Sequence, residues 1–251
     1  LDTIDPDGLL EYSVVFTDRS LNHMSFKFQS VMRDISSILK EVYAADAVAL
    51  IPGGGTYAME AVARQIAVNK RVMVLRNGWF SYRWSQIFEA GSIPLSEIVM
   101  KARRSGNGPK AAFAPMQIKE VVAKISADQP DVVFAPHVET SSGIILPDDY
   151  LKAISDAVHS YGGLFVLDCI ASGCAWVNMR TTGVDFIISA PQKGWSASPS
   201  AGMVMMSRAG LTAVRTNQSN SFSVDLGKWL SIMEAYENGT HMYHTTMPTD
   251  A

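Results

Sequence analysis

The sequence predicts an α/β fold with three layers, in which helices cover both faces of a mainly parallel β-sheet. Short apolar runs alternate along the chain with stretches of helical periodicity, which is the pattern of parallel strands joined by helices. The chain has 251 residues, of which 47% are hydrophobic. A chain of this length and composition is able to bury a large core, so we expect these elements to form one large domain.

Six apolar runs are candidates for strands, at residues 47–52, 71–78, 131–137, 163–168, 185–190 and 202–207. Helical periodicity predicts helices at residues 26–43, 56–68, 80–90, 116–126 and 148–161, and another helix after Asp225. The helix at residue 148 follows Pro147 and carries two aspartates in its first turn, where they suit the positive end of the helix dipole. We expect residues 1–25 to form an N-terminal segment and residues 26–251 to form the large domain.

Charge and hydropathy limit the expected partners. The formal net charge is -3, and no basic run is interleaved with aromatic residues, so nucleic acid is not an expected partner. No apolar run reaches the roughly 18 residues of a membrane span, and the N-terminus lacks the features of a signal peptide. The two cysteines, Cys169 and Cys174, are too few for a disulfide framework. We therefore expect a cytoplasmic protein that binds a small molecule or another copy of itself.

Polar residues and glycines follow most of the predicted strands. Ligands of open α/β sheets bind beyond the carboxyl ends of the strands, so these positions are the first candidates for a site. The first strand is followed by Gly53-Gly54-Gly55-Thr56, the second by Asn77-Gly78-Trp79-Phe80, and the third by HVETSSG at residues 137–143. The fourth strand ends at Asp168, and the fifth runs into Gln192 and Lys193.

Each of these features also has a purely structural interpretation. The glycine cluster either exposes N–H groups to an anion or forms a tight turn, and it has the spacing of neither a dinucleotide fingerprint nor a P-loop. Trp79 and Phe80 either stack on a ligand or pack in the core, and HVETSSG either binds a ligand or forms a hydrogen-bonded loop. Asp168 and Lys193 are more discriminating, because a buried carboxylate or ammonium is costly without a partner. Burial would also lower the pKa of Lys193 and prepare its amine as a nucleophile.

Together these strand ends carry the groups that one cofactor requires. Pyridoxal 5′-phosphate needs a lysine amine for its aldehyde, a carboxylate for its pyridine nitrogen, an aromatic face for its ring and a glycine-rich helix start for its phosphate. Asp168 and Lys193 are 25 residues apart, a separation that spans one strand and the adjoining loops. We expect both residues on neighbouring segments at one edge of the sheet.

The same segments resemble those of the class V (fold type I) pyridoxal-phosphate aminotransferases, in particular the alanine–glyoxylate and serine–pyruvate branch. The resemblance runs from about Phe26 to the end of the chain. GGGTYAMEA resembles the family's phosphate-binding turn, NGWFSYR its ring-stacking segment, and HVETSSG its H-x-E-[ST]-S-[ST]-G loop. LFVLDCIAS and VDFIISAPQK match the strands that end in the pyridine-nitrogen aspartate and in the Schiff-base lysine.

The resemblance implies a role for each candidate residue. It makes Asp168 and Lys193 catalytic, and it places Gly54, Gly55, Thr56 and Gln192 at the cofactor phosphate, Thr140 near the ring, and Phe80 on the ring with Trp79 as a near competitor. SFSVDLGKWL and MYHTT resemble the stretches that precede and form an intersubunit phosphate contact. Tyr243 and Thr246 are therefore expected to reach the phosphate of the other subunit in a homodimer with shared active sites.

The resemblance implies the large domain of a fold type I enzyme that moves an amino group from a small amino acid to a 2-oxo acid such as pyruvate or glyoxylate. The family's small C-terminal domain is expected to be absent from this chain, because the sequence stops soon after MYHTT. Two alternatives remain open, namely a pyridoxal-phosphate lyase or desulfurase and a truncated, non-catalytic protein that binds the cofactor. A cysteine desulfurase requires a mobile cysteine, whereas Cys169 and Cys174 are expected in the core.

Overall fold

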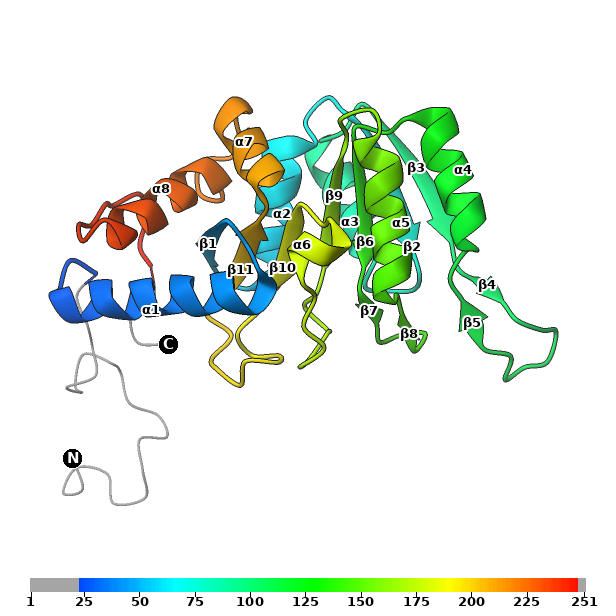
Figure 1. The fold of residues 1–251 in the computed structure, drawn as a ribbon, viewed down its shortest axis with the longest axis horizontal. Coiled ribbons are helices and arrows are strands. Elements are labelled where there is room, and N and C mark those ends of the chain that lie inside the picture. Colours follow the sequence, from blue (N-terminus) through cyan, green and yellow to red (C-terminus); the bar gives the residue numbers. More distant parts are fainter. Residues whose placement is uncertain (1–22, 248–251) are drawn as a thin grey trace, which may run out of the picture.

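The protein, as a computed structural model that describes residues 23–247, is built around a seven-stranded sheet. The strand order is β1-β11-β10-β9-β6-β2-β3 (Figure 1). Neighbouring strands are parallel except at β11, which is antiparallel to both β1 and β10. The strands are β1 (Ala47–Pro52), β2 (Arg71–Arg76), β3 (Ser96–Lys101), β6 (Val132–Pro136), β9 (Leu164–Asp168), β10 (Phe186–Ser189) and β11 (Ala201–Met206).

Helices cover the two faces of this sheet. They are α1 (Phe26–Tyr43), α2 (Gly55–Ile66), α3 (Tyr82–Gly91), α4 (Ile118–Asp128), α5 (Asp148–His159), α6 (Met179–Thr182), α7 (Arg208–Thr216) and α8 (Leu226–Glu237). Figure 1 shows α4 and α5 in front of the sheet and α2 and α3 behind it, while α1 and α8 pack together beside the edge strand β1. The predicted α/β fold with three layers is therefore confirmed.

Helix α1 illustrates how the sequence sets these elements. Ser25 caps its first turn by accepting a hydrogen bond from the Phe28 amide, and Ala44 ends it in a left-handed conformation. Its apolar residues recur at helical spacing, so that Phe28, Met32 and Leu39 share one buried face. The strands β6 and β10 are instead buried along their whole length, as expected at the centre of a sheet that is covered on both faces.

All six predicted strands and all six predicted helices are present, with ends that differ by up to two residues. The strand β3 was missed because it is an edge strand in which Met100 alone is buried, and its apolar run is only three residues long, at 98–100. The short helices α6 and α7 were also missed, as were two small hairpins, β4 (Arg103–Arg104) with β5 (Phe113–Ala114) and β7 (Val138–Glu139) with β8 (Ile144–Ile145). The predicted N-terminal segment lies, up to residue 22, outside the described residues.

The register of the central strands brings their carboxyl ends to one edge of the sheet. Asp168 at the end of β9 is paired with Pro136 of β6 on one side and with Ile188 of β10 on the other. Backbone hydrogen bonds continue beyond the strands, since the His137 N–H donates to the Asp168 carbonyl and the Cys169 N–H to the Ile188 carbonyl, both at 2.8 Å. The segments that follow these three strands therefore lie side by side, at the lower edge in Figure 1.

None of the helices within residues 23–247 is long and apolar enough to cross a membrane.

Candidate active site

The turn between β1 and α2 has the conformation of an anion-binding site. Gly53 and Gly54 have φ angles of 114° and 122°, which residues with side chains rarely adopt. A Cβ atom on Gly55 would lie 2.6 Å from Cδ1 of Ile170, so a larger residue at this position would displace the Ile170 side chain. Helix α2 has no side-chain cap, and no acceptor among the described residues pairs with the N–H groups of Gly55 and Thr56. These free donors lie at the positive end of the helix, where a phosphate binds favourably.

Asp168 ends β9 as a carboxylate that is only 8% exposed. Its Oδ1 accepts a hydrogen bond from the Ile170 N–H at 2.9 Å, whereas its Oδ2 has no donor within residues 23–247. Burial raises the pKa of Asp168 to about 6, although the nearby positive charges of Arg83 and Lys193 act in the opposite direction. This is the state expected of a carboxylate whose cationic partner is a bound ligand.

Lys193 lies in the turn after β10, and its positive charge acts to lower the pKa of Asp168. Its N–H donates to the Ala190 carbonyl at 3.3 Å. A Cβ atom on the next residue, Gly194, would lie 2.1 Å from the carbonyl oxygen of Gly173, so the turn packs tightly against the segment after β9. The side chain of Lys193 is exposed, so the prediction of a buried lysine was wrong. The reason is that the lysine follows the strand by four residues and stands outside the packed layers.

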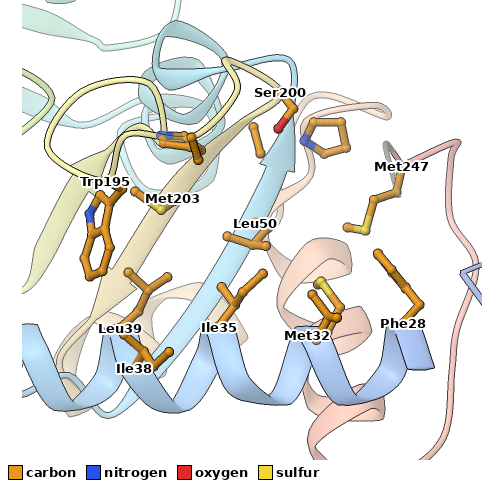
Figure 2. Close-up of a pocket in the computed structure, with 15 residues that line it drawn as sticks. Phe28, Met32, Ile35, Ile38, Leu39, Leu50, Trp195, Ser200, Met203 and Met247 are labelled. Carbon is orange, nitrogen blue, oxygen red and sulfur yellow. The ribbon is translucent and has the colours of Figure 1, made fainter. Parts of the chain in front are cut away.

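An apolar cleft lies between α1 and the loop that carries Lys193 (Figure 2). Met32 and Leu39 of α1, Leu50 of β1, Trp195 and Met203 are among its lining residues. No charged side chain lines it. The cleft therefore has no group suited to an anionic cofactor, and the candidate site remains at the carboxyl ends of the strands.

The turn that carries Trp79 and Phe80 is held by a buried glutamate, Glu139. The two carboxylate oxygens of Glu139 accept hydrogen bonds from the N–H groups of Phe80 (3.1 Å) and Ser81 (2.8 Å) and from the hydroxyls of Ser81 (2.7 Å) and Ser141 (2.6 Å). The Ser141 hydroxyl in turn accepts from the Trp79 N–H at 2.8 Å. One buried carboxylate thus joins the HVETSSG segment to the aromatic turn.

The surroundings of Glu139 keep it ionised. Burial raises the pKa of this carboxyl, but the hydrogen bonds from Ser141, Ser81 and Phe80 together outweigh that effect, so the pKa lies below its ordinary value. Helix α3 starts directly after Ser81, and the carboxylate therefore also meets the positive end of the helix dipole. A Cβ atom on Gly78 would lie 2.2 Å from Oγ of Ser141, so glycine is required there. Glu139 was not among the predicted site residues.

The side chains predicted to contact the cofactor are exposed, in contrast to the buried Glu139. Trp79 is 64% and Phe80 is 40% exposed, so neither packs in the core. The side chains of Thr56, Thr140 and Gln192 are exposed as well. Below them His137 is buried, and its Nδ1 lies 2.7 Å from Oγ of Ser172 in the segment after β9. Burial lowers the pKa of His137, so the neutral form of its ring is favoured.

Tyr243 and Thr246 lie in a different part of the molecule, in the segment after α8. Tyr243 is 65% exposed, and the centroid of its ring is 5.8 Å from that of His23. Thr246 is exposed too. Within residues 23–247, neither side chain forms a hydrogen bond with the turn at residues 53–56. The structure therefore leaves both residues outside the site that the other predicted residues form.

The two cysteines differ in their surroundings. Cys169 is buried, as predicted, and burial raises the pKa of its thiol. Cys174 is exposed, and its Sγ lies 4.0 Å from the carbonyl oxygen of Gly194. The prediction that Cys174 lies in the core was wrong, because the chain has already left the sheet at this point.

Known proteins resemble the chain in sequence and in fold. Alanine–glyoxylate aminotransferase 1 of Saccharomyces cerevisiae is 26% identical over 245 residues, which cover 91% of this chain and 60% of the yeast protein. The 2-aminoethylphosphonate–pyruvate transaminase of Paraburkholderia phymatum is 27% identical over 238 residues, which cover 92% of this chain and 58% of that protein. The crystal structure of an alanine–glyoxylate aminotransferase from Nostoc sp. matches with a TM-score of 0.77 at 23% identity, over 92% of this chain and 58% of that one.

The chain thus spans 60% or less of the length of each of these proteins. The sequence profile of the aminotransferase class-V family matches residues 9–246 and so includes every strand end described above. The chain therefore belongs to the class-V aminotransferase family, whose cofactor is pyridoxal 5′-phosphate and whose fold is fold type I.

Proposed function

We propose that this protein is a transaminase that moves an amino group from a small amino acid to a 2-oxo acid such as pyruvate or glyoxylate. One observation carries the proposal: the free N–H donors of α2, the carboxylate of Asp168 with its free Oδ2, and the amine of Lys193 converge at one edge of the sheet. The names of the yeast and Paraburkholderia relatives support the choice of substrates. The two free thiols support a cytoplasmic location.

The residues at this edge fit the charges of pyridoxal phosphate. Its phosphate dianion suits the glycine turn, where donors without acceptors meet the positive end of α2. Its protonated pyridine nitrogen suits Asp168, because a cation offsets the burial of that carboxylate. When bound, the cofactor supplies an electron sink that stabilises negative charge at the α-carbon of the substrate.

The residues of the chain bind and orient the cofactor, and they move a proton beside it. The amine of Lys193 would hold the cofactor at its aldehyde carbon, with release of water, and would move a proton at the substrate α-carbon once the substrate amine had displaced it. Asp168 keeps the pyridine nitrogen protonated, since an ionised carboxylate stabilises the adjacent positive charge. The remaining contacts are assigned to Gly54, Gly55, Thr56 and Gln192 at the phosphate and to Phe80, Trp79 and Thr140 around the ring.

An absorbance experiment tests the proposal. The purified chain loaded with pyridoxal phosphate is expected to be yellow, and adding L-alanine without an acceptor should remove the visible band as the amino group is transferred. Adding pyruvate or glyoxylate should restore the band, and a panel of amino acids and aminophosphonates would identify the donor. If the cofactor binds but no donor changes the spectrum, the protein is a non-catalytic binder. Release of sulfide from cysteine would indicate a desulfurase.

We also propose that the active unit is a homodimer in which Tyr243 and Thr246 reach the phosphate bound by the partner subunit. The exposure of both side chains and their position outside the site of their own chain support this. A hydroxyl contact to a phosphate dianion contributes roughly 1.5–3 kcal/mol, so replacing both residues by alanine should weaken cofactor binding about tenfold or more.

Mixing two impaired variants, at a cofactor concentration too low to fill the sites of the double variant, tests the shared site. Lys193→Ala and the Tyr243→Ala/Thr246→Ala double variant are combined after reversible dissociation. In shared sites, a heterodimer carries both lesions in one site and neither in the other, so part of the activity should return. Each variant mixed with itself is the control. Heterodimers that form, as shown by tagged subunits, without any return of activity would rule out the shared site.

A further inference from the structure

We propose that Arg83 is a further residue of the cofactor site, where its guanidinium binds the phosphate group beside Thr56. The inference rests on the proposed function. It adds a cation to a phosphate site to which the glycine turn contributes only neutral donors. Nothing in the spacing of the sequence motifs pointed to this arginine.

The position of Arg83 is defined by two contacts. Its Nη1 lies 3.4 Å from Oγ1 of Thr56, in the first turn of α2. Its Cζ lies 5.8 Å from the centroid of the Phe80 ring, within the range of a cation–π interaction. The guanidinium therefore lies between the turn assigned to the phosphate and the aromatic residue assigned to the ring.

Hydrogen bonds to the Phe80 carbonyl and to the buried Glu139 fix the backbone around Arg83. Arg83 is the second residue of α3, and its N–H donates to the Phe80 carbonyl at 3.1 Å. The residue before this helix, Ser81, is bound to the buried carboxylate of Glu139 through both its N–H and its hydroxyl. Glu139 thus fixes the start of α3, and with it the position from which the Arg83 side chain reaches Thr56.

The charge of Arg83 has no partner of its own. Arg64, Arg103 and Arg215 pair with glutamates, whereas Arg83, like several other described arginines, forms no ion pair. No carboxylate within residues 23–247 lies within ion-pair distance of Arg83. A partly buried guanidinium without a counter-ion is a candidate for an anionic ligand, because Arg forms strong, charge-assisted bonds with phosphate.

Helix dipoles strengthen the argument. A cation in the first turn of a helix is unfavourable, because it adds to the positive end of the dipole. Neither α2 nor α3 has an acidic residue in its first turn, and Glu139 is already occupied by the donors at the start of α3. The uncapped start of α2 and the charge of Arg83 therefore create a positive region that a phosphate dianion would neutralise.

A different role for Arg83 has to be separated from this one. Its charge also lowers the pKa of Asp168, so the arginine acts to some degree on the carboxylate assigned to the ring. An effect through Asp168 or Phe80 would concern the ring and not the phosphate. Pyridoxal, which has the ring and the aldehyde but no phosphate, distinguishes the two roles.

The experiment compares Arg83→Gln and Arg83→Lys with the unchanged chain. The control variant is Arg76→Gln, because Arg76 also carries a positive charge over an aromatic ring, 4.4 Å from the centroid of Tyr82, without contacting Thr56. Binding of pyridoxal phosphate, pyridoxal and inorganic phosphate to each cofactor-free chain is measured by fluorescence and calorimetry. Thermal unfolding checks that every variant is folded, and Arg83→Lys keeps the charge if Arg83→Gln does not fold.

Arg83→Gln is expected to weaken binding of pyridoxal phosphate and of inorganic phosphate about tenfold or more, and to leave pyridoxal binding within about twofold. For pyridoxal phosphate and inorganic phosphate, the affinity of Arg83→Lys should lie between that of the unchanged chain and that of Arg83→Gln. The reason is that lysine keeps the charge but loses the planar fork. Equal losses for pyridoxal phosphate and pyridoxal, or no loss beyond that of Arg76→Gln, would overturn the assignment. If the unchanged chain binds no pyridoxal phosphate but binds inorganic phosphate through Arg83, the anion site stands and the proposed function fails. If it binds neither, both are wrong.

Discussion

Replacing Lys193 by alanine is expected to abolish amino transfer while leaving part of the cofactor affinity. The amine of Lys193 is assigned both the covalent hold on the cofactor and the proton transfer at the substrate α-carbon, and alanine supplies neither. The phosphate and pyridine contacts do not involve this side chain, so noncovalent binding should persist. Because Lys193 is exposed, its removal should change stability by less than about 0.5 kcal/mol.

Chemical labelling gives a measurement that does not depend on turnover. Borohydride reduction of the loaded chain fixes the pyridoxyl group to the lysine that holds it, and peptide mapping should find the group on residue 193. Lys101→Ala, which removes another exposed lysine at a strand end, is the control and should retain both labelling and activity. A label on any other lysine would contradict the assignment.

The sequence was sufficient to predict the residues at the strand ends. Asp168 and Lys193 each follow an apolar run, and the parallel pairing of β9 with β10 brings the ends of those runs together. This inference needs no knowledge of side-chain packing, because the carboxyl ends of parallel strands share one edge of the sheet. The same reasoning located the glycine turn, the aromatic turn and the HVETSSG segment.

The supporting residues could not be predicted in this way. Glu139 binds Phe80 and Ser81, which are 59 and 58 residues away along the chain, so no local pattern shows that its carboxylate is buried and satisfied. Arg83 looks in the sequence like any arginine of an amphipathic helix, and its lack of a counter-ion emerges only from the structure. The exposure of Lys193 was missed because apolar neighbours in the sequence do not reveal where the chain leaves the sheet.

Replacing Asp168 by asparagine is expected to have opposite effects on stability and on catalysis. In the cofactor-free chain, burial raises the pKa of Asp168 from 3.8 to about 6, so at pH 7 the folded state holds an unpaired carboxylate at a cost of about 3 kcal/mol. Asparagine keeps an oxygen for the Ile170 N–H and carries no charge, so the variant should be more stable at pH 7 by up to that amount. As pH falls from about 6 toward 4, the folded wild type takes up a proton before the unfolded chain does, and the difference should shrink.

With the cofactor bound, the same change should slow exchange of the substrate α-proton by orders of magnitude, because a neutral amide no longer keeps the pyridine nitrogen protonated. Urea unfolding of the cofactor-free chains at pH 7 and pH 4.5 measures the first effect, and exchange of alanine's α-proton with deuterated water, followed by NMR, measures the second. Asp131→Asn, at the opposite end of β6, is the control: its carboxylate accepts the Arg71 N–H at 2.8 Å in an exposed position, so exchanging a charged for a neutral acceptor should lower stability slightly and keep exchange. If Asp168 merely capped a strand end, Asp168→Asn would behave like this control. Gain of stability together with loss of exchange therefore identifies a carboxylate that destabilises the cofactor-free protein and is required to hold the cofactor.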